Sequence, residues 1–437
     1  MSTFILLFAH GAFALDRDMA RFAAAKETQA RELADSQANK APSLVWSFFD
    51  AVRVDDWETA TNLFARLDVM KGARANPAPD SPAFALRQPV WATIAETYGA
   101  YEAFQNWDNK WLRRFGREVI DSIPKESIYF GGTDPGRFII SALSESHRDG
   151  EPFFTITQNQ LADASYLDYV RRMYGSKIQI PSVEDLRKVF QDYVADARER
   201  LRTGRLKPGE DVRIVDEQVQ VSGQVAVMEL NARLTKIIFS RNQGREFYVE
   251  ESFPLDWMYP YLSPHGLIFK LNSTPLAGLR KETVERNEDY WRRLTAEIVG
   301  NWMTDKTTVE EICDFTEKVY HQENLKGFKG DAGFVQSDDT QKCFSKLRSS
   351  IAALYVWRAQ RAKDEEERNR LRKSADLAYR QAIAMCPYSP EAVFRYCQLL
   401  RETKRIDDAL LIAKTAARFE PDNSSVANLI RSLRRSE

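Results

Sequence analysis

The sequence predicts an α/β plus α fold, with a helical N-terminal part, a central and mainly parallel α/β layer, and a C-terminal helical region. In the middle of the chain, short aromatic and β-branched segments alternate with longer helical stretches, a pattern typical of strands joined by crossover helices. Towards the C-terminus, a pattern of small residues and prolines recurs after 34 residues. These two observations decide the fold class.

The chain of 437 residues is long enough for two or three folded domains. We predict four segments: a short apolar N-terminal segment (1–16), a helical region with a helix hairpin (17–120), an α/β domain (121–278) and a helical region (279–437) whose repeats cover 345–437. The 62 basic and 63 acidic residues almost cancel. This balance argues against a nucleic-acid partner, which selects for a basic excess.

The helical region 17–120 contains two amphipathic helices in residues 43–70, "SLVWSFFDAVRVDDWETATNLFARLDVM". The pattern breaks at "RVDDW", where Asp55 or Asp56 is placed to cap the second helix. We expect a helix hairpin here, with an apolar seam between the two helices.

Five segments of the α/β domain have strand composition: "SIYFGG" (127–132), "PFFTITQ" (152–158), "DVRIVDEQVQVSG" (211–223), "REFYVEESF" (245–253) and "HGLIFKLN" (265–272). We predict that the segments 126–131, 152–158 and 246–252 lie in one sheet. A helix over 224–242, with Ser222 as its cap, is expected between the third and fourth segments.

The repeat near the C-terminus joins "ADLAYRQAIAMCPYSPEA" (375–392) to "DALLIAKTAARFEPDNSS" (408–425). Pro387 and Pro421 are 34 residues apart, and small or aromatic residues recur at the same offset: Ala375, Tyr379 and Ala382 match Ala409, Ala413 and Ala416. This pattern resembles the tetratricopeptide repeat, whose paired helices stack on one another. The resemblance implies a protein partner bound through the C-terminal helices.

The run "GGTDPGRF" (131–138) lies between a predicted strand and a predicted helix, where nucleotide sites often begin. It fits neither the phosphate-binding GxxxxGK[ST] loop nor the dinucleotide GxGxxG pattern. Two interpretations remain open. Thr133 or Asp134 caps the helix, with Pro135 in its first turn, or the loop and Arg137 face an anionic or polar ligand.

The stretch "IPKESIYFGGTDPGRFIISAL", with "PFFTITQNQLADASYLDYVRRMYG", resembles the soluble C-terminal part of bacterial multi-spanning proteins related to the protein O-mannosyltransferases. The similarity covers residues ~120–275 and places Asp134 at the family's turn aspartate. That family's catalytic carboxylate lies between membrane helices, and this chain has no stretch of such length. The resemblance therefore implies an extracytoplasmic accessory region and transfers no catalytic residue.

Ligands of open α/β sheets bind beyond the carboxyl ends of the strands. Two sets of candidate ligand-binding residues follow: Thr133, Asp134, Arg137, Gln158 and Asn159 in one polar crevice, and Glu251, Asp256 and Trp257 in the acidic and aromatic segment 248–266. The expected ligand is a glycan or an anion. Three interpretations of the segment 248–266 remain open: packing of its aromatic residues, ligand binding, and catalysis by its carboxylates.

We expect no metal and no cofactor, because the four cysteines lack metal-ligand spacing and the chain has only four histidines. The apolar residues near the N-terminus, "FILLFAHGAFA", are too few to cross a bilayer alone. They are consistent with a signal peptide or with the end of a longer membrane segment, so we expect membrane association or an extracytoplasmic location rather than a cytoplasmic one.

The function predicted from the sequence is a non-catalytic binding or scaffold protein. It would form the soluble accessory region of a membrane glycosyltransferase-like system, with a protein-binding C-terminal end. The alternative is a glycan-processing enzyme, or a fragment of a membrane glycosyltransferase, that uses carboxylates of the central domain near residues 250–256.

Overall fold

The computed structural model describes residues 15–36, 40–72, 77–215 and 218–435. The chain divides into two compact units, Met1–Gln105 and Asn106–Glu437. The fold class predicted from the sequence is confirmed: a mixed, mostly parallel sheet lies in the central part of the chain, and helices make up both ends.

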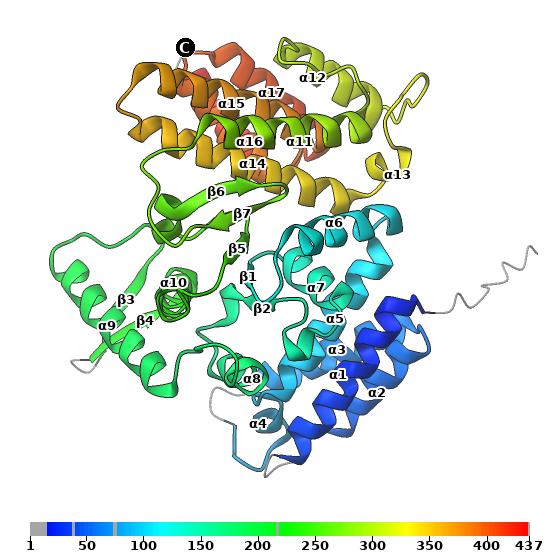
Figure 1. Ribbon diagram of the computed structural model, residues 1–437, viewed down its shortest axis with the longest axis vertical. Helices are drawn as coiled ribbons and strands as arrows, with labels where there is room; N and C mark the ends of the chain where they lie inside the picture. Colours follow the sequence, from blue (N-terminus) through cyan, green and yellow to red (C-terminus); the bar gives the residue numbers. More distant parts are fainter. Residues whose placement is uncertain (1–14, 37–39, 73–76, 216–217, 436–437) are drawn as a thin grey trace, which may run out of the picture. The chain divides into compact units, whose positions relative to one another are not determined.

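The first unit contains five helices in its described residues, drawn in blue to cyan in Figure 1. They are α1 (Arg17–Asp35), α2 (Ser43–Arg53), α3 (Trp57–Gly72), α4 (Pro82–Leu86) and α5 (Val90–Asn106). The predicted hairpin is α2 and α3, and the carboxylate of Asp56 accepts a hydrogen bond of 3.0 Å from the amide of Thr59 at the start of α3. Phe48, Phe49 and Leu67 are buried in its seam.

The second unit contains all the strands that the structure describes. Its helices are α6 (Asn109–Ser122), α7 (Asp134–Leu143), α8 (Ala164–Tyr174), α9 (Val183–Arg202), α10 (Gly223–Arg241), α11 (Lys281–Val299), α12 (Val309–Thr316), α13 (Ala332–Val335), α14 (Asp338–Arg361), α15 (Glu365–Met385), α16 (Pro390–Glu402), α17 (Ile406–Phe419) and α18 (Ser424–Arg434). Four short segments have other helical geometry: η1 (His147–Asp149), η2 (Gln158–Gln160), η3 (Asp256–Tyr261) and the π-helical η4 (Glu317–His321).

The central sheet has the strand order β2-β1-β5-β7-β6. Its strands are β1 (Ile128–Gly131), β2 (Phe154–Thr157), β5 (Phe247–Glu250), β6 (Leu262–His265) and β7 (Ile268–Leu271). β1 pairs in parallel with β2 and with β5, whereas β7 is antiparallel to both β5 and β6. Every residue of β1, β2 and β5 is buried, as expected for strands covered on both faces.

Two details of the sheet differ from the sequence prediction. The segment 211–223 forms a separate hairpin of β3 (Asp211–Val215) and β4 (Gln218–Ser222), whose alternating, largely exposed side chains do not suit a sheet covered on both faces. β6 was not predicted, because its sequence "LSPH" contains a proline and lacks strand composition. Ser222 does precede α10, but its hydroxyl donates to Asp211 instead of capping the helix.

The C-terminal helices form successive neighbouring pairs, α14 with α15, α16 with α17, and α17 with α18. Figure 1 shows α14 beside the strands β6 and β7, with α15, α16 and α17 on its other side. The six small or aromatic residues of the 34-residue pattern are all buried, with at most 2% of their surface exposed. Small side chains at these positions allow the helices to approach closely.

Arg358 of α14 joins these helices to the edge of the sheet. Its buried guanidinium donates hydrogen bonds to the carbonyls of Leu276 (2.8 Å), Pro260 (2.8 Å), Tyr259 (3.1 Å) and Leu262 (3.3 Å). The segment η3, which precedes β6, contains Pro260 and has an irregular backbone, in which the carbonyl of Tyr259 accepts from the amide of Leu262 and that of Pro260 from the amide of Leu276. The Arg358 side chain supplies a further donor to both carbonyls.

We predict that Arg358→Met lowers the free energy of unfolding by about 3 kcal/mol, because it removes the four hydrogen bonds that this buried guanidinium donates. Chemical denaturation of the full chain, followed by tryptophan fluorescence, measures this change. The matched control is Arg361→Met, one turn further along α14, where the side chain is exposed and the expected change is within about 0.5 kcal/mol. Equal stability of the two variants would contradict this role of Arg358.

Candidate functional site

Three loops meet at the carboxyl ends of β1, β2 and β5, as the parallel pairing requires. The glycine loop follows β1, the amide pair Gln158 and Asn159 follows β2, and Glu250 and Glu251 lie at the end of β5. Both carboxylates are buried, with 0% and 5% of their residue surfaces exposed. We call this cluster the carboxylate cradle: Glu250, Glu251, Thr133, Gln158, Asn159 and the glycines Gly132 and Gly136.

The Glu250 carboxylate lies at the N-terminus of α7, beside the glycine loop. It accepts hydrogen bonds from the backbone amide of Thr133 (3.1 Å) and from the hydroxyl of Thr133 (2.6 Å). The same hydroxyl accepts from the amide of Gly136 at 3.2 Å and so caps the helix. A helix N-terminus attracts negative charge, and here the chain provides it from its own side chain.

Glu251 is held by the loops that follow β2 and β5. One carboxylate oxygen accepts from the side-chain amides of Gln158 (2.6 Å) and Asn159 (3.2 Å), and the other accepts from the backbone amides of Ser252 (2.8 Å) and Phe253 (3.2 Å). The Asn159 amide also donates to the carbonyl of Gly132 at 2.8 Å. These donors satisfy Glu251 within the protein.

The glycines are explained by the two carboxylates. A Cβ atom on Gly132 would lie 1.9 Å from an oxygen of Glu251, and a Cβ atom on Gly136 would lie 1.7 Å from an oxygen of Glu250. Both distances are far below van der Waals contact, so only glycine fits. The glycine-rich run thus makes room for internal carboxylates.

The other two residues of the predicted crevice, Asp134 and Arg137, form an ion pair with each other across the first turn of α7. The guanidinium of Arg137 also lies over the ring of Phe138, 4.4 Å from its centre. Of the five residues predicted to line one crevice, the structure places Thr133 against Glu250, and Gln158 and Asn159 against Glu251. Asp134 and Arg137 pair with each other.

The pKa of the Glu250 carboxyl is raised from 4.5 to about 7. Burial is the main cause, since it penalises the charged form, and the neighbouring charge of Glu251 adds to it. The hydrogen bonds from Thr133 and Gly132 act in the opposite direction and do not overcome the burial. Glu250 therefore changes charge near neutral pH inside the fold.

Beyond the cradle, the helices α14, α15 and α16 and the segment η3 enclose an open groove of about 540 Å³. We call it the aromatic groove. Its walls are Asp256 and Tyr259 of η3, Ala353, Val356, Trp357, Gln360 and Arg361 of α14, Tyr379 of α15, and Arg395, Gln398, Leu399 and Glu402 of α16. This volume lies within the usual range of ligand sites.

Of the remaining predicted site residues, Asp256 is exposed and lines the aromatic groove, whereas Trp257 does not. The ring of Trp257 packs against Phe239 of α10 (5.3 Å between ring centres) and Tyr261 (6.2 Å). The packing interpretation thus describes Trp257, and Tyr259, two residues further on, faces the groove. The groove residues of α14 and α16 were not identified from the sequence; the aromatic segment 257–261 was the only signal for this wall.

Arg395 connects the groove to the cradle. Its guanidinium donates to the carbonyl of Ser252 at 2.5 Å and to the hydroxyl of Ser349 at 3.2 Å, and it lies over the ring of Phe253, 4.2 Å from its centre. The hydroxyl of Ser350 donates to the carbonyl of Glu251 at 2.9 Å. The loop after β5 is therefore held by α14 and α16, the helices that form the groove.

Within the described ranges, no group of three or more His, Cys, Asp or Glu side chains is arranged to hold a metal ion. The same ranges contain no helix with the length and apolar character needed to span a bilayer. The apolar N-terminal segment, on which the expected membrane association depends, lies outside the described residues up to position 14.

Comparison of the chain with models of known protein families, with curated proteins and with solved structures gives no match.

We predict that burial of Glu250 makes stability depend on pH. Because its pKa is higher in the folded chain than the 4.5 of an unperturbed glutamate, its contribution is complete below about pH 4.5 and is lost as the pH rises to about 7. The loss amounts to about 3 kcal/mol. Glu250→Gln stays neutral, so its free energy of unfolding should rise relative to the wild type between pH 4.5 and pH 8. Urea denaturation across this range measures the difference, and a constant difference would contradict the shifted pKa.

We predict that Gly136→Ala lowers the free energy of unfolding by about 2 kcal/mol or more, because the added methyl group overlaps the Glu250 carboxylate. Gly244→Ala is the matched control, since a Cβ atom there meets nothing within 4 Å. The double variant Gly136→Ala/Glu250→Ala should recover part of the loss. Thermal unfolding of five proteins, the wild type and the single variant Glu250→Ala included, decides the point, and strictly additive effects would argue against the overlap.

Proposed function

We propose that this protein is a non-catalytic binding protein and that the aromatic groove takes an extended peptide segment of a partner protein. The observation that carries this proposal is the set of polar groups in the groove. Within the part of the chain that the structure describes, no hydrogen bond is recorded for the side chains of Tyr259, Trp357 or Gln360. These groups supply donors and acceptors that a ligand can use.

The chemistry of the groove suits a peptide backbone. The side-chain amide of Gln360 offers a donor and an acceptor, which can bond the carbonyl and the N–H of a bound peptide. The rings of Tyr259 and Trp357, 5.5 Å apart, provide an apolar surface for side chains. Helix-lined grooves are a common site for peptide segments, and their aromatic side chains often contribute most of the affinity.

The charges of the groove balance. Asp256 and Glu402 face Arg361 and Arg395, so the groove has two side chains of each sign. Arg395 is already bonded to Ser252, and Glu402 accepts from Gln398 at 3.0 Å. A partner segment of low net charge, with apolar or aromatic side chains, is therefore favoured over a highly charged one.

The geometry gives less support to the enzyme alternative. The enzyme alternative assigns catalysis to carboxylates near residues 250–256. Two of these, Glu250 and Glu251, are buried and accept hydrogen bonds from other groups of the chain. An acid that protonates a glycosidic oxygen must reach the substrate. Asp256 alone of these acidic residues is exposed in the groove.

The sequence resemblances support a choice of partners to test first. The tetratricopeptide-like pattern of α15 and α17 favours a protein ligand. The similarity of residues ~120–275 to the soluble part of membrane glycosyltransferase-like proteins favours a partner from such a membrane system. Both points rest on the sequence.

A displayed library of random peptides tests the proposal, with the full chain as bait. We expect selected peptides to bind with micromolar dissociation constants, as measured by fluorescence anisotropy. Trp357→Ala should weaken this binding by about tenfold or more, because truncating an aromatic anchor costs about 1–3 kcal/mol. Gln360→Ala should weaken it by a smaller factor.

The matched control is Phe190→Ala, which removes a half-exposed ring of α9 outside the groove and should leave the affinity unchanged. Thermal unfolding of each variant shows that the fold is intact. Selected peptides that bind Trp357→Ala as tightly as the wild type would exclude the groove as their site. Binding of an oligosaccharide array at wild-type level, lost in Trp357→Ala, with no peptide selected, would replace the peptide by a glycan.

A further inference from the structure

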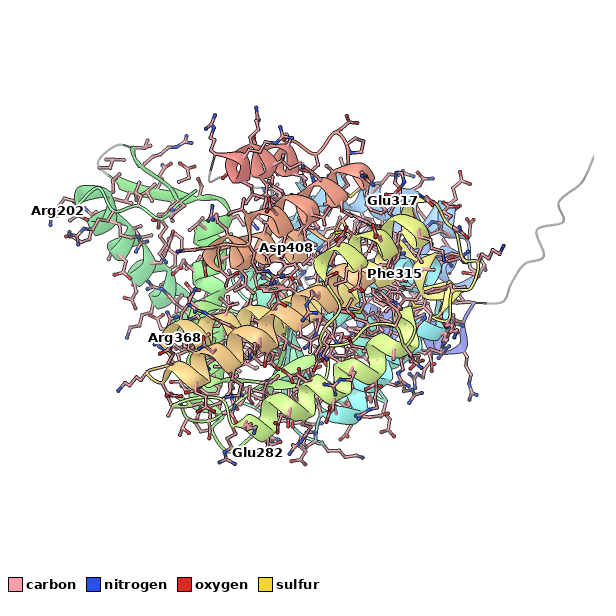
Figure 2. All side chains as sticks on the ribbon, turned by 90° about the horizontal axis from the view of Figure 1, so that it is seen from above. Arg202, Glu282, Phe315, Glu317, Arg368 and Asp408 are labelled. Carbon is pink, nitrogen blue, oxygen red and sulfur yellow. The ribbon has the colours of Figure 1, made fainter. Side chains whose placement is uncertain are left out.

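We propose that a second cavity, distinct from the aromatic groove, binds a small molecule that carries a phosphate group. This basic cavity has a volume of about 590 Å³ and lies between α11, α15 and the turn from α16 to α17. Its walls are Glu288, Asp305, Arg370, Arg372, Lys373, Ser374, Asp376, Leu377, Arg380, Leu399, Thr403 and Arg405. Figure 2 looks onto these helices, with Glu282 near the start of α11, Arg368 near the start of α15 and Asp408 in α17.

The cavity concentrates positive charge in a chain that is otherwise nearly neutral. Five of its side chains are cationic and three are carboxylates, so its formal charge is +2, whereas the whole chain has a formal charge of −1. A cavity lined by one excess sign of charge concentrates counter-ions and charged ligands. The positive charge of this cavity favours an anionic ligand.

Two of the five cations, Arg380 and Arg405, share one internal carboxylate, and Arg405 also pairs with Asp408. Asp376 accepts from Arg380 at 2.9 Å, from Arg405 at 2.7 Å and from the hydroxyl of Tyr396 at 3.0 Å. Arg380 also donates to the carbonyls of Asp305 and Thr307, so it is fixed from both sides. This network forms a rigid floor and needs no ligand.

The other three cations, Arg370, Arg372 and Lys373, have no ion pair recorded within the described ranges. Arg370 is the most informative of them. One terminal nitrogen of its guanidinium is buried without a hydrogen-bond partner, and the other reaches the carbonyl of Leu279 only at 3.3 Å. An unpaired buried donor on a charged group is costly, so the Arg370 guanidinium has donor capacity that the fold leaves unused.

Arginine donors in this arrangement recognise oxyanions. A guanidinium binds phosphate through two parallel hydrogen bonds, and an ammonium adds a point charge beside it. The volume of the cavity matches that of sites for small molecules. A phosphate ester of small-molecule size therefore fits the charge, the donors and the space. This proposal does not depend on the peptide proposed for the aromatic groove, because the two sites share only the buried residue Leu399.

Isothermal titration of the full chain with inorganic pyrophosphate, in 0.15 M NaCl, tests the proposal. We expect a dissociation constant of about 1 mM or lower. Arg370→Gln and the double variant Arg372→Gln/Lys373→Gln should each weaken binding by about tenfold or more. Pyrophosphate should also raise the unfolding temperature of the wild type and not that of the variants.

The control for net charge is Arg187→Gln/Arg202→Gln, which removes two exposed cations of α9, an element that does not line the cavity; Arg202 is labelled in Figure 2. This variant should bind pyrophosphate like the wild type. Unfolding temperatures without pyrophosphate show that every variant is folded. If the control and the cavity variants lose affinity for pyrophosphate equally, the effect is general electrostatics, and the proposed site is wrong. Binding to vesicles of phosphatidic acid and phosphatidylcholine without binding of soluble pyrophosphate would likewise overturn the small-molecule ligand in favour of a lipid surface.

Discussion

The burial of two adjacent carboxylates at the end of β5 is the constraint on which the central domain depends. Two adjacent acidic side chains away from water are tolerated only if their oxygens have hydrogen-bond donors, and those donors come from the loops after β1, β2 and β5. The requirement fixes the glycines of the first loop and the amide side chains of the second. It also fixes the position of Ser252, to whose carbonyl α16 is bonded through Arg395. The sheet and the C-terminal helices thus meet at one electrostatic centre.

The strands β1, β2 and β5 were predictable, because strands covered on both faces are short, continuously apolar and bounded by Gly or Pro. A cap of α7 at Thr133 or Asp134 was also predictable, since capping is a local property, and in the structure Thr133 is the cap. β6 was not, because its pairing with β7 is a tertiary contact that overrides a sequence containing proline. Local pattern therefore gave the frame of the domain, and long-range pairing completed it.

The candidate sites show the same division more sharply. Thr133, Gln158 and Asn159 were placed at the strand ends from the topology of α/β sheets alone, and they do meet there. The sequence could not show that Thr133 bonds Glu250, or that Gln158 and Asn159 bond Glu251, 92 residues from Asn159. Nor could it show that Trp357 and Tyr259 face one groove, because the sequence of one helix does not indicate which other element lies beside it. Such contacts follow from the packing of whole elements.

Trp357 and Arg358 are consecutive residues of α14 with different surroundings. The first lines the aromatic groove, and the second bonds the carbonyls at the edge of the sheet. Because one helical backbone carries both side chains, a ligand that moved α14 at the indole would also move the guanidinium at the edge strand β6. The two events would then be thermodynamically linked, and by reciprocity an influence that loosens β6 would alter the affinity of the groove. The groove and the sheet edge thus share α14 as a common element of the second unit.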